Sequence, residues 1–268
     1  MASREGSGTG CQVNPDSIVI RKCHQLDEMR ACVALQKDVW NFSDADLVPL
    51  RMFVVAEKVG GQVIGAFAGN EMVGFALSIP GARSGHLYLH SHMLAVRKQH
   101  QNAGLGRRIK LFQREDAIAR GFELIEWTFD PLEIKNAYLN IEKLGAIARR
   151  YSANQYGITS SPLQGGLPTD RLVAEWWLKS KRVEMLLREG KRSRVETVTV
   201  ISVPFQIYDW KSDPDTRRQA KEVQDRNREQ FAKAFGDGLA VLGYERDEQG
   251  SGRFLLGRWD EKWMYSAT

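Results

Sequence analysis

The alternation of apolar and polar residues predicts strands and one helix in the first hundred residues. Residues 17–23 and 86–96 alternate with a period of two, which is typical of strands with one buried face. Residues 62–81 contain two apolar runs around Gly69-Asn70, the pattern of a β-hairpin. Apolar residues recur at helical spacing over residues 26–40. The chain therefore begins as strand, helix, hairpin and strand.

A loop, a helix, a strand and a second helix are expected next. The loop at 101–106 precedes a helix from Gly106 to about Arg120, which Gly121 ends. Residues 124–130 have the apolar content of a strand.

The second helix is predicted from a capping pattern. Asp130 would be its N-cap, Pro131 its first residue and Glu133 its capping-box acid. We expect this helix to end near Gly145.

The last third of the chain is predicted to be a smaller α+β portion. Residues 158–170 are polar and rich in Gly and Pro, so they indicate a loop, and residues 170–180 predict a strand. Another strand, a long charged helix at 215–235 and a hairpin follow. We divide the chain into a disordered tail (1–16), an α/β domain (17–180) and a C-terminal extension (181–268).

Composition places the chain among soluble globular proteins. Hydrophobic residues make up 43% of its 268 residues and charged residues 26%. No apolar run approaches the roughly 20 residues of a bilayer-spanning helix, and the N-terminus lacks the apolar core of a signal peptide. We therefore expect a cytoplasmic protein without a membrane partner. Cys11, Cys23 and Cys32 show neither zinc-site nor disulfide spacing and are expected to be free thiols.

The net charge of +5 favours a small anionic ligand. The helix at 215–235 balances both signs of charge, so it does not indicate nucleic-acid binding; it suits a solvated helix or a contact in a homodimer.

The stretch Gln101-Asn102-Ala103-Gly104-Leu105-Gly106 is the first candidate site. It precedes a helix, where unpaired N–H groups and the helix dipole attract anions, and glycine allows close approach to the backbone. Arg97, Lys98, Arg107 and Arg108 could bind further phosphates. The spacing is also compatible with an ordinary helix start. It matches neither the dinucleotide fingerprint nor the Walker loop.

The same stretch resembles the acyl-CoA loop of the GNAT superfamily of N-acyltransferases. The resemblance consists of Leu94-Ala95-Val96, four residues, and then Gln101-x-x-Gly104-x-Gly106 at the start of a helix. The order of elements over residues 18–178 and the "EKLGA" at 142–146 also fit the family. Residues 181–268 have no counterpart in the minimal fold.

This resemblance implies a fold and a binding mode. The fold would be α/β (α+β), with a mixed, mostly antiparallel sheet, splayed fourth and fifth strands and helices on both faces. The loop amides and Arg107 would bind the pyrophosphate of CoA. The main chain at Leu94, Ala95 and Val96 would pair with the pantetheine arm, and Asn136 would meet its end.

The resemblance leaves the proton-transfer groups open. Many members carry an acidic tyrosine four residues before the glycine that ends the fourth helix, but that position is Ile141 here. Tyr138 or Tyr151 could substitute, water could protonate the thiolate, or the chain could lack catalysis. His90 and His92 share a strand face and are the candidate bases, with Glu126 a weaker candidate.

We therefore expect a metal-independent N-acyltransferase that uses acetyl-CoA or another acyl-CoA. Its acceptor would be a small-molecule amine or a peptide amine. The alternative is a catalytically silent CoA-binding module that retains the loop.

Overall fold

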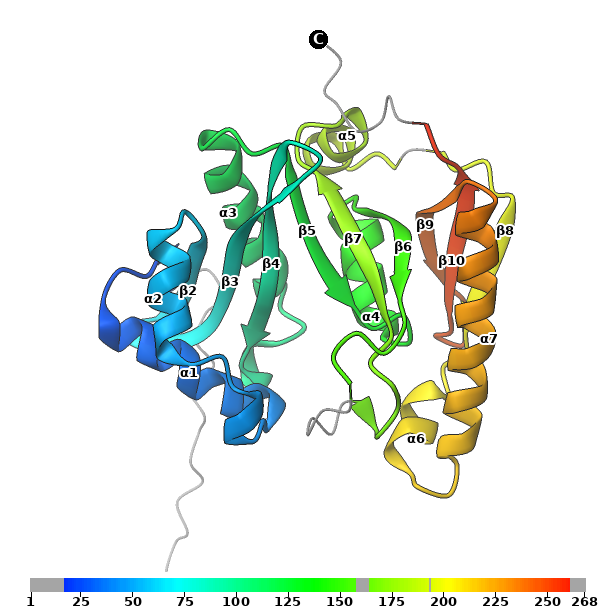
Figure 1. The fold of residues 1–268 in the computed structure, drawn as a ribbon, viewed down its shortest axis with the longest axis horizontal. Coiled ribbons are helices and arrows are strands. Elements are labelled where there is room, and N and C mark those ends of the chain that lie inside the picture. Colours follow the sequence, from blue (N-terminus) through cyan, green and yellow to red (C-terminus); the bar gives the residue numbers. More distant parts are fainter. Residues whose placement is uncertain (1–16, 158–163, 193, 261–268) are drawn as a thin grey trace, which may run out of the picture.

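The computed structural model describes residues 17–157, 164–192 and 194–260, and its strands form one ten-stranded sheet (Figure 1). The strand order is β1-β2-β3-β4-β5-β7-β6-β9-β10-β8. All neighbours pair antiparallel except β4 and β5, which are parallel. The predicted fold class, a mixed and mostly antiparallel sheet, is confirmed. The predicted tail at 1–16 lies outside the described residues.

The elements up to the parallel pair are β1 (Ile18–Lys22), α1 (Leu26–Trp40), α2 (Leu50–Lys58), β2 (Gln62–Ala68), β3 (Glu71–Arg83), β4 (His86–Val96), α3 (Leu105–Ala119) and β5 (Leu124–Phe129). Single 3-10 turns lie at η2 (Asp44–Asp46) and η3 (Lys98–His100). The remaining elements are α4 (Ile134–Ala137), η4 (Tyr138–Lys143), β6 (Ile147–Ser152), β7 (Arg171–Trp177), α5 (Lys181–Glu189), β8 (Thr199–Val203), α6 (Ile207–Ser212), α7 (Arg217–Gly236), β9 (Leu239–Arg246) and β10 (Gly252–Arg258).

Helices cover both faces of the N-terminal strands, because the apolar residues of β2 and β3 alternate between two cores. Phe75 and Leu77 pack with α1 and α2 on one face. Ile64 and Ala76 pack with Leu105 and Ile109 of α3 on the other. Strands with both faces buried read as continuous apolar runs, which is why the hairpin was visible in the sequence.

The parallel pair β4–β5 is short. Only Leu89↔Ile125 and His90↔Glu126 are in register, although β4 continues to Val96 and β5 to Phe129. The two strands diverge below these pairs (Figure 1). The predicted splay is therefore present, and its apex lies at His90 and Glu126.

Two β-bulges change which side chains share a face. The β3–β4 register shifts so that Leu77 faces Met93 and Ser78 faces Ser91, which leaves His92 as an extra residue on β4. The β6–β7 register shifts so that two residues of β6, Arg149 and Arg150, lie opposite one residue of β7. A bulge places neighbouring side chains on one face where a regular strand would alternate them.

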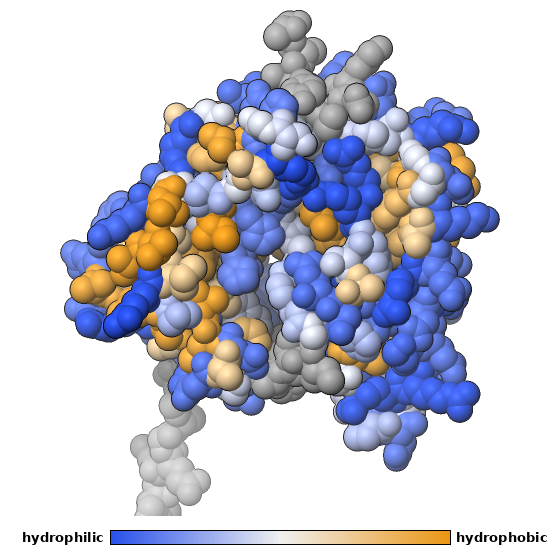
Figure 2. All heavy atoms as spheres, viewed as in Figure 1, coloured by the Kyte–Doolittle hydropathy of each residue, from blue (hydrophilic) through white to orange (hydrophobic). Residues whose placement is uncertain are grey.

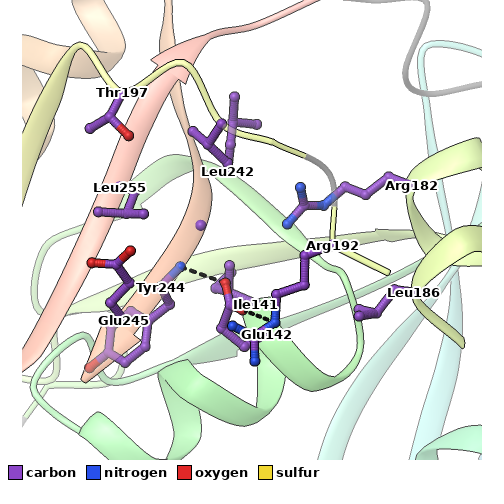
Figure 3. Close-up of a pocket in the computed structure, with 12 residues that line it drawn as sticks. Ile141, Glu142, Arg182, Leu186, Arg192, Thr197, Leu242, Tyr244, Glu245 and Leu255 are labelled. Atoms are coloured by element: carbon purple, nitrogen blue, oxygen red, sulfur yellow. Dashed lines mark hydrogen bonds and ion pairs between the residues drawn. The ribbon is translucent and has the colours of Figure 1, made fainter. Parts of the chain in front are cut away.

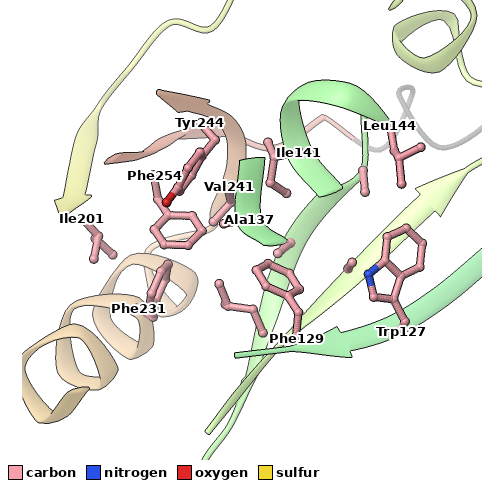
Figure 4. Close-up of a cluster of buried hydrophobic side chains, with 14 of the residues drawn as sticks. Trp127, Phe129, Ala137, Ile141, Leu144, Ile201, Phe231, Val241, Tyr244 and Phe254 are labelled. Atoms are coloured by element: carbon pink, nitrogen blue, oxygen red, sulfur yellow. The ribbon is translucent and has the colours of Figure 1, made fainter. Parts of the chain in front are cut away.

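The C-terminal extension continues the sheet. In the described residues β9 joins β6 at the single register pair Ala148↔Val241. A shared core links the two parts: Phe231, Val241, Tyr244 and Phe254 cluster with apolar side chains of β5, α4 and η4 (Figure 4).

Several elements were not predicted from the sequence. The sequence patterns do not indicate α2, β6, α5 or α6. The expected helix after Asp130 begins later, at Ile134, because residues 131–132 form a turn. The capping-box prediction is wrong at Asp130, whose carboxylate accepts the N–H of Leu132 and a bond from Lys211 Nζ.

The end of that helix is as predicted. Gly145 has a φ of 79°, the left-handed conformation that favours glycine after a helix. The last six residues, Tyr138–Lys143 (η4), however, form a π-helix. π-Helices are rare, and those that occur often lie at functional sites.

Among the described residues, no helix combines the length and apolar character that crossing a bilayer requires.

Candidate active site

The loop between β4 and α3 leaves the start of α3 open. Gly104 is the N-cap with a φ of 80°, and no side chain caps the helix. Asn102 also has a positive φ, 61°. A Cβ added at Gly104 would meet no atom within 4 Å, so the glycine is required by its backbone conformation and the space above it is empty. The first N–H groups of α3 can therefore bind an anion.

The cationic residues near the loop are committed to different partners. Arg97 pairs with Glu71 and, at 3.4 Å, with Asp38, so it does not face the loop. Arg108 donates to the carbonyl of Ile18 at 2.8 Å. Arg107 is half-buried, and its Nε lies 3.4 Å from the carbonyl of Lys143 at the end of η4. Of these three arginines, Arg107 lies between the two helices that flank the splay.

The edge of β4 next to the splay has no strand partner among the described residues beyond His90. Leu94, Ala95 and Val96 form this edge, and only the carbonyl of Val96 has a recorded side-chain partner, the Nε2 of Gln101 at 2.8 Å. Peptide groups on an unpaired edge are available to a ligand that lies along the strand. Figure 2 shows the surface hollowed where β4 and β5 separate.

A buried lysine lies at the apex of the splay. Lys110, from α3, donates from Nζ to Ser91 Oγ of β4 at 2.9 Å and to Gln113 Oε1 at 3.0 Å. Its Nζ also lies 3.7 Å from the ring centroid of Trp127 on β5. Lys110 is 2% exposed, and no described carboxylate pairs with it. Burial lowers the pKa of Lys110 well below its ordinary value.

Lys110 belongs to a buried polar network. Ser91, Gln113, Ser78 and Gln62 are hydrogen-bonded in sequence between α3 and strands β2 to β4. A buried ammonium without a counter-ion costs stability. No local pattern indicates that this lysine is buried, because Lys110 follows Ile109 in a helix whose other charged residues are more exposed.

The two candidate bases lie together on the opposite face of β4. The rings of His90 and His92 are 6.1 Å apart. Burial, the neighbouring His92, Lys110 and Arg150 lower the pKa of His90 to about 4, against an opposing effect of Glu126. Burial also lowers the pKa of His92. His90 is therefore an uncharged imidazole at neutral pH.

The predicted tyrosine and its neighbours face elsewhere. Tyr138 lies 4.3 Å from Arg246, whose guanidinium stacks on its ring, and Lys143 and Arg192 lower its pKa against the effect of burial. Ile141 is completely buried and points into the core beneath the extension (Figure 4). Asn136 is exposed on α4.

The second tyrosine is also engaged. The hydroxyl of Tyr151 donates to Asp170 Oδ2 at 2.5 Å, and burial raises its pKa.

A cavity of about 230 Å³ lies beside η4, between β9 and α5 (Figure 3). Its polar lining includes Glu142, which pairs with Arg192 at 3.0 Å, and Arg182, whose Nε donates to the carbonyl of Gly145. Ile141 also lines it. The face of η4 that holds Ile141 thus turns toward the extension.

Glu126 forms part of an ion network on the His90 face. It is 4% exposed and is held by Arg83 and Arg150, while Glu175 is held by Arg149 and Arg150. The weaker catalytic candidate Glu126 is thus bonded to two guanidinium groups.

Solved structures of other proteins are similar to part of this chain. No protein-family model matches the chain, and no curated protein matches it in sequence. A solved ribosomal-protein-S18-alanine N-acetyltransferase from Escherichia coli is 15% identical, with 59% of this chain and 92% of that chain covered and a TM-score of 0.47. A GNAT family acetyltransferase from Elizabethkingia anophelis, solved with acetyl-CoA bound, is 17% identical, with coverage of 60% and 99% and a TM-score of 0.46.

A third solved structure, an acetyltransferase of the GNAT family from Streptococcus pneumoniae, is 18% identical, with coverage of 59% and 98% and a TM-score of 0.47. The mixed, mostly antiparallel sheet and the splay of its fourth and fifth strands are those that the family resemblance implied. The chain has a GNAT-like fold. The additional strands β8 to β10 with α6 and α7 extend that fold by a third block of sheet.

Proposed function

We propose that the protein is an acyl-CoA-dependent N-acyltransferase, with acetyl-CoA as the expected donor. Two observations carry the proposal: the helix start at Gly104 that no side chain caps, and the edge of β4 that has no strand partner among the described residues after His90. A ligand with an anionic end and a narrow extended arm would suit these two features. When bound, the acyl-CoA would supply an activated acyl carbon as a thioester.

The loop amides from Gln101 to Gly106 would hold the pyrophosphate, assisted by Arg107. Leu94, Ala95 and Val96 would pair with the pantetheine arm. Val96 could do so through its N–H, or through its carbonyl once the Gln101 side chain moves. Asn136 is exposed and stays a candidate for the end of that arm.

The amine nitrogen of the acceptor would form the new C–N bond as the C–S bond breaks. His90 would accept the proton that the amine loses, with His92 beside it, since its imidazole is uncharged at neutral pH. We propose that Lys110 delivers a proton from Nζ to the sulfur of the departing thiolate, because Lys110 lies at the apex on the α3 side. A lowered pKa makes an ammonium group a more effective acid near neutral pH.

Tyr138 remains the alternative proton donor. Its contacts with Arg246 and Lys143 support a role at the extension instead.

An assay with purified protein tests the proposal. We expect acetyl-CoA to raise the melting temperature and an amine panel to release free thiol. Stabilisation by acetyl-CoA without thiol release would favour the silent CoA-binding module. Absence of both effects would refute acyl-CoA binding.

A further inference from the structure

Three arginines lie together on the His90 face of the sheet, next to the apex of the splay. They are Arg83 at the end of β3 and the bulge residues Arg149 and Arg150 of β6. Because the β6 bulge directs two consecutive side chains to one face, both reach the carboxylate of Glu175. We call these three residues the arginine platform.

The platform is held from below by two buried carboxylates. Arg83 binds both oxygens of Glu126, Arg150 bridges Glu126 and Glu175, and Arg149 Nε lies 3.0 Å from Glu175 Oε2. The carboxylates are 4% and 1% exposed, whereas the three arginine side chains are 43%, 33% and 39% exposed. Solvent on this face therefore meets guanidinium groups.

Aromatic rings fix the outer two guanidinium groups. Arg83 stacks over Tyr88 at 4.8 Å, and Arg149 stacks over Trp259 at 4.9 Å. Gly81 makes the first stack feasible, since a Cβ there would lie 2.6 Å from the Tyr88 ring. Oriented, partly exposed guanidinium groups are the usual recognition element for carboxylate and phosphate.

Within this network of five residues, positive charges outnumber negative charges. Three arginines outnumber two glutamates, and His90 and His92 add no positive charge at neutral pH because their pKa values are lowered. Glu126, a member of the network, is the register partner of His90. One small molecule could therefore have its anionic group on the platform and its amine at the apex.

We propose that the arginine platform binds an anionic group of the acceptor, so that the acceptor is an amine that also carries a carboxylate or a phosphate. This inference rests on the proposed function, since it places the acceptor amine at the apex of the splay.

Binding to the CoA-loaded protein tests the proposal without turnover. Two matched pairs of amines are used as probes in calorimetry: L-alanine with L-alaninamide, and O-phosphoethanolamine with ethanolamine. We expect the anionic member of at least one pair to bind about tenfold or more tightly than its neutral partner. The pair that shows the difference identifies carboxylate or phosphate. Equal or undetectable binding of both members in both pairs would overturn the proposal.

Two variants separate recognition from structural support. Arg149→Gln leaves Glu126 with both partners and Glu175 with Arg150, so the fold should persist while the preference for the anionic probe falls about tenfold. Glu175→Gln removes a negative charge beneath the platform and should increase that preference. A purely structural network would move melting temperature in both variants and leave the preference unchanged.

Arg253→Gln is the matched control. Arg253 is similarly exposed on β10 and pairs with Glu245 at 3.6 Å, away from the splay. Arg253→Gln should change neither the preference for the anionic probe nor the melting temperature. Failure of the acyl-CoA proposal is visible separately, as loss of CoA stabilisation in the unmodified protein.

Discussion

At the scale of single residues, Lys110 is the most informative side chain. Its amine is buried among Ser91, Gln113 and Trp127, with no carboxylate partner in the described chain. Its lowered pKa means that the unfolded chain holds a proton on Lys110 more tightly than the folded protein does. Lys110 therefore destabilises the fold below pH 10.5, the ordinary value, and this cost disappears above it.

Lys110→Met should accordingly raise the free energy of unfolding at pH 7, and the gain should shrink as the pH approaches 10.5. Ser91 and Gln113 already bond to each other, so the change leaves no buried polar atom without a partner. If Lys110 donates the proton to the thiol, the same variant should lose roughly 100-fold in kcat. Acetyl-CoA should still stabilise it.

Denaturant titrations at pH 7 and 9.5, with thiol-release assays, measure these effects. Lys110→Arg keeps the charge but not the compact amine and should not restore the rate. A stable Lys110→Met variant with normal kcat would remove Lys110 from the mechanism.

His90 predicts a second pH dependence. Its pKa falls to about 4 on folding from an ordinary value of 6.5. As the pH is lowered, His90 is therefore protonated in the unfolded chain at a higher pH than in the folded protein. Stability contributed by the uncharged His90 is present above pH 6.5 and is lost as the pH falls toward 4. His90→Gln should therefore flatten the decline of melting temperature between pH 6.5 and 4.5.

The rate should respond in the same range. A base with a pKa of about 4 produces a rise in rate near pH 4, and His90→Gln should abolish it. His24→Gln is a suitable control, because His24 is an exposed histidine paired with Glu57. A pH profile of His90→Gln that coincides with that of the unmodified protein would exclude His90 as the base.

At the scale of elements, the open N-terminus of α3 yields the sharpest prediction. Gly104→Asp places a negative charge where the diphosphate is expected and should abolish stabilisation by CoA. Gly104 has a φ of 80°, so any side chain there also costs about 1 kcal/mol of folding free energy.

Gly121→Asp is the matched control for that strain. Gly121 follows the end of the same helix with a φ of 83° and equally open surroundings. A side chain at Gly121 therefore has the same backbone strain but lies away from the proposed diphosphate site. We expect normal CoA stabilisation only in Gly121→Asp, and a lower melting temperature for that variant because its charge lies at the negative end of the helix dipole. Unchanged CoA affinity in folded Gly104→Asp would refute the loop assignment.

Most elements of the fold could be predicted from the sequence, because their patterns are local. The period of two in β4 and the Gly69-Asn70 turn place the first strands correctly. Strand β6 was missed because its bulge puts Arg149 and Arg150 on one face, which breaks the alternation. The capping pattern at Asp130 was misread because its tertiary partner, Lys211, lies 81 residues away in sequence.

The candidate site could be predicted only in part, for the same reason. The loop at 101–106 is a local motif. Lys110 and the arginine platform depend on contacts between α3, β3, β6 and β7, which no spacing along the chain reveals.

At the scale of the whole molecule, the extension is joined to the rest through buried charges. Lys211 of α6 is 6% exposed and donates to Asp130 at 3.0 Å and to Glu133 at 2.7 Å. These carboxylates outweigh burial and raise the pKa of Lys211. The shared core around Phe231 and Phe129 joins the same two parts.

Lys211→Met should destabilise the protein by about 3–5 kcal/mol, because Asp130 would stay buried without its counter-ion. Unfolding in denaturant should remain a single transition for residues 17–260. Lys221→Met, which breaks an exposed pair with Asp225 on α7, should cost under about 0.5 kcal/mol. Two separate transitions, with only the later one shifted in Lys211→Met, would show that the extension folds alone.

The uneven pairing along the sheet has a mechanical consequence. The sheet consists of three well-paired blocks of strands: β1 to β4, then β5, β7 and β6, and then β9, β10 and β8. Two register pairs join the first block to the second, and one register pair joins the second block to the third. Small rotations cost the fewest backbone hydrogen bonds along these two hinge lines. The splay lies on the first hinge line and the cavity beside η4 on the second, so a rotation about either line would change the width of the opening next to it.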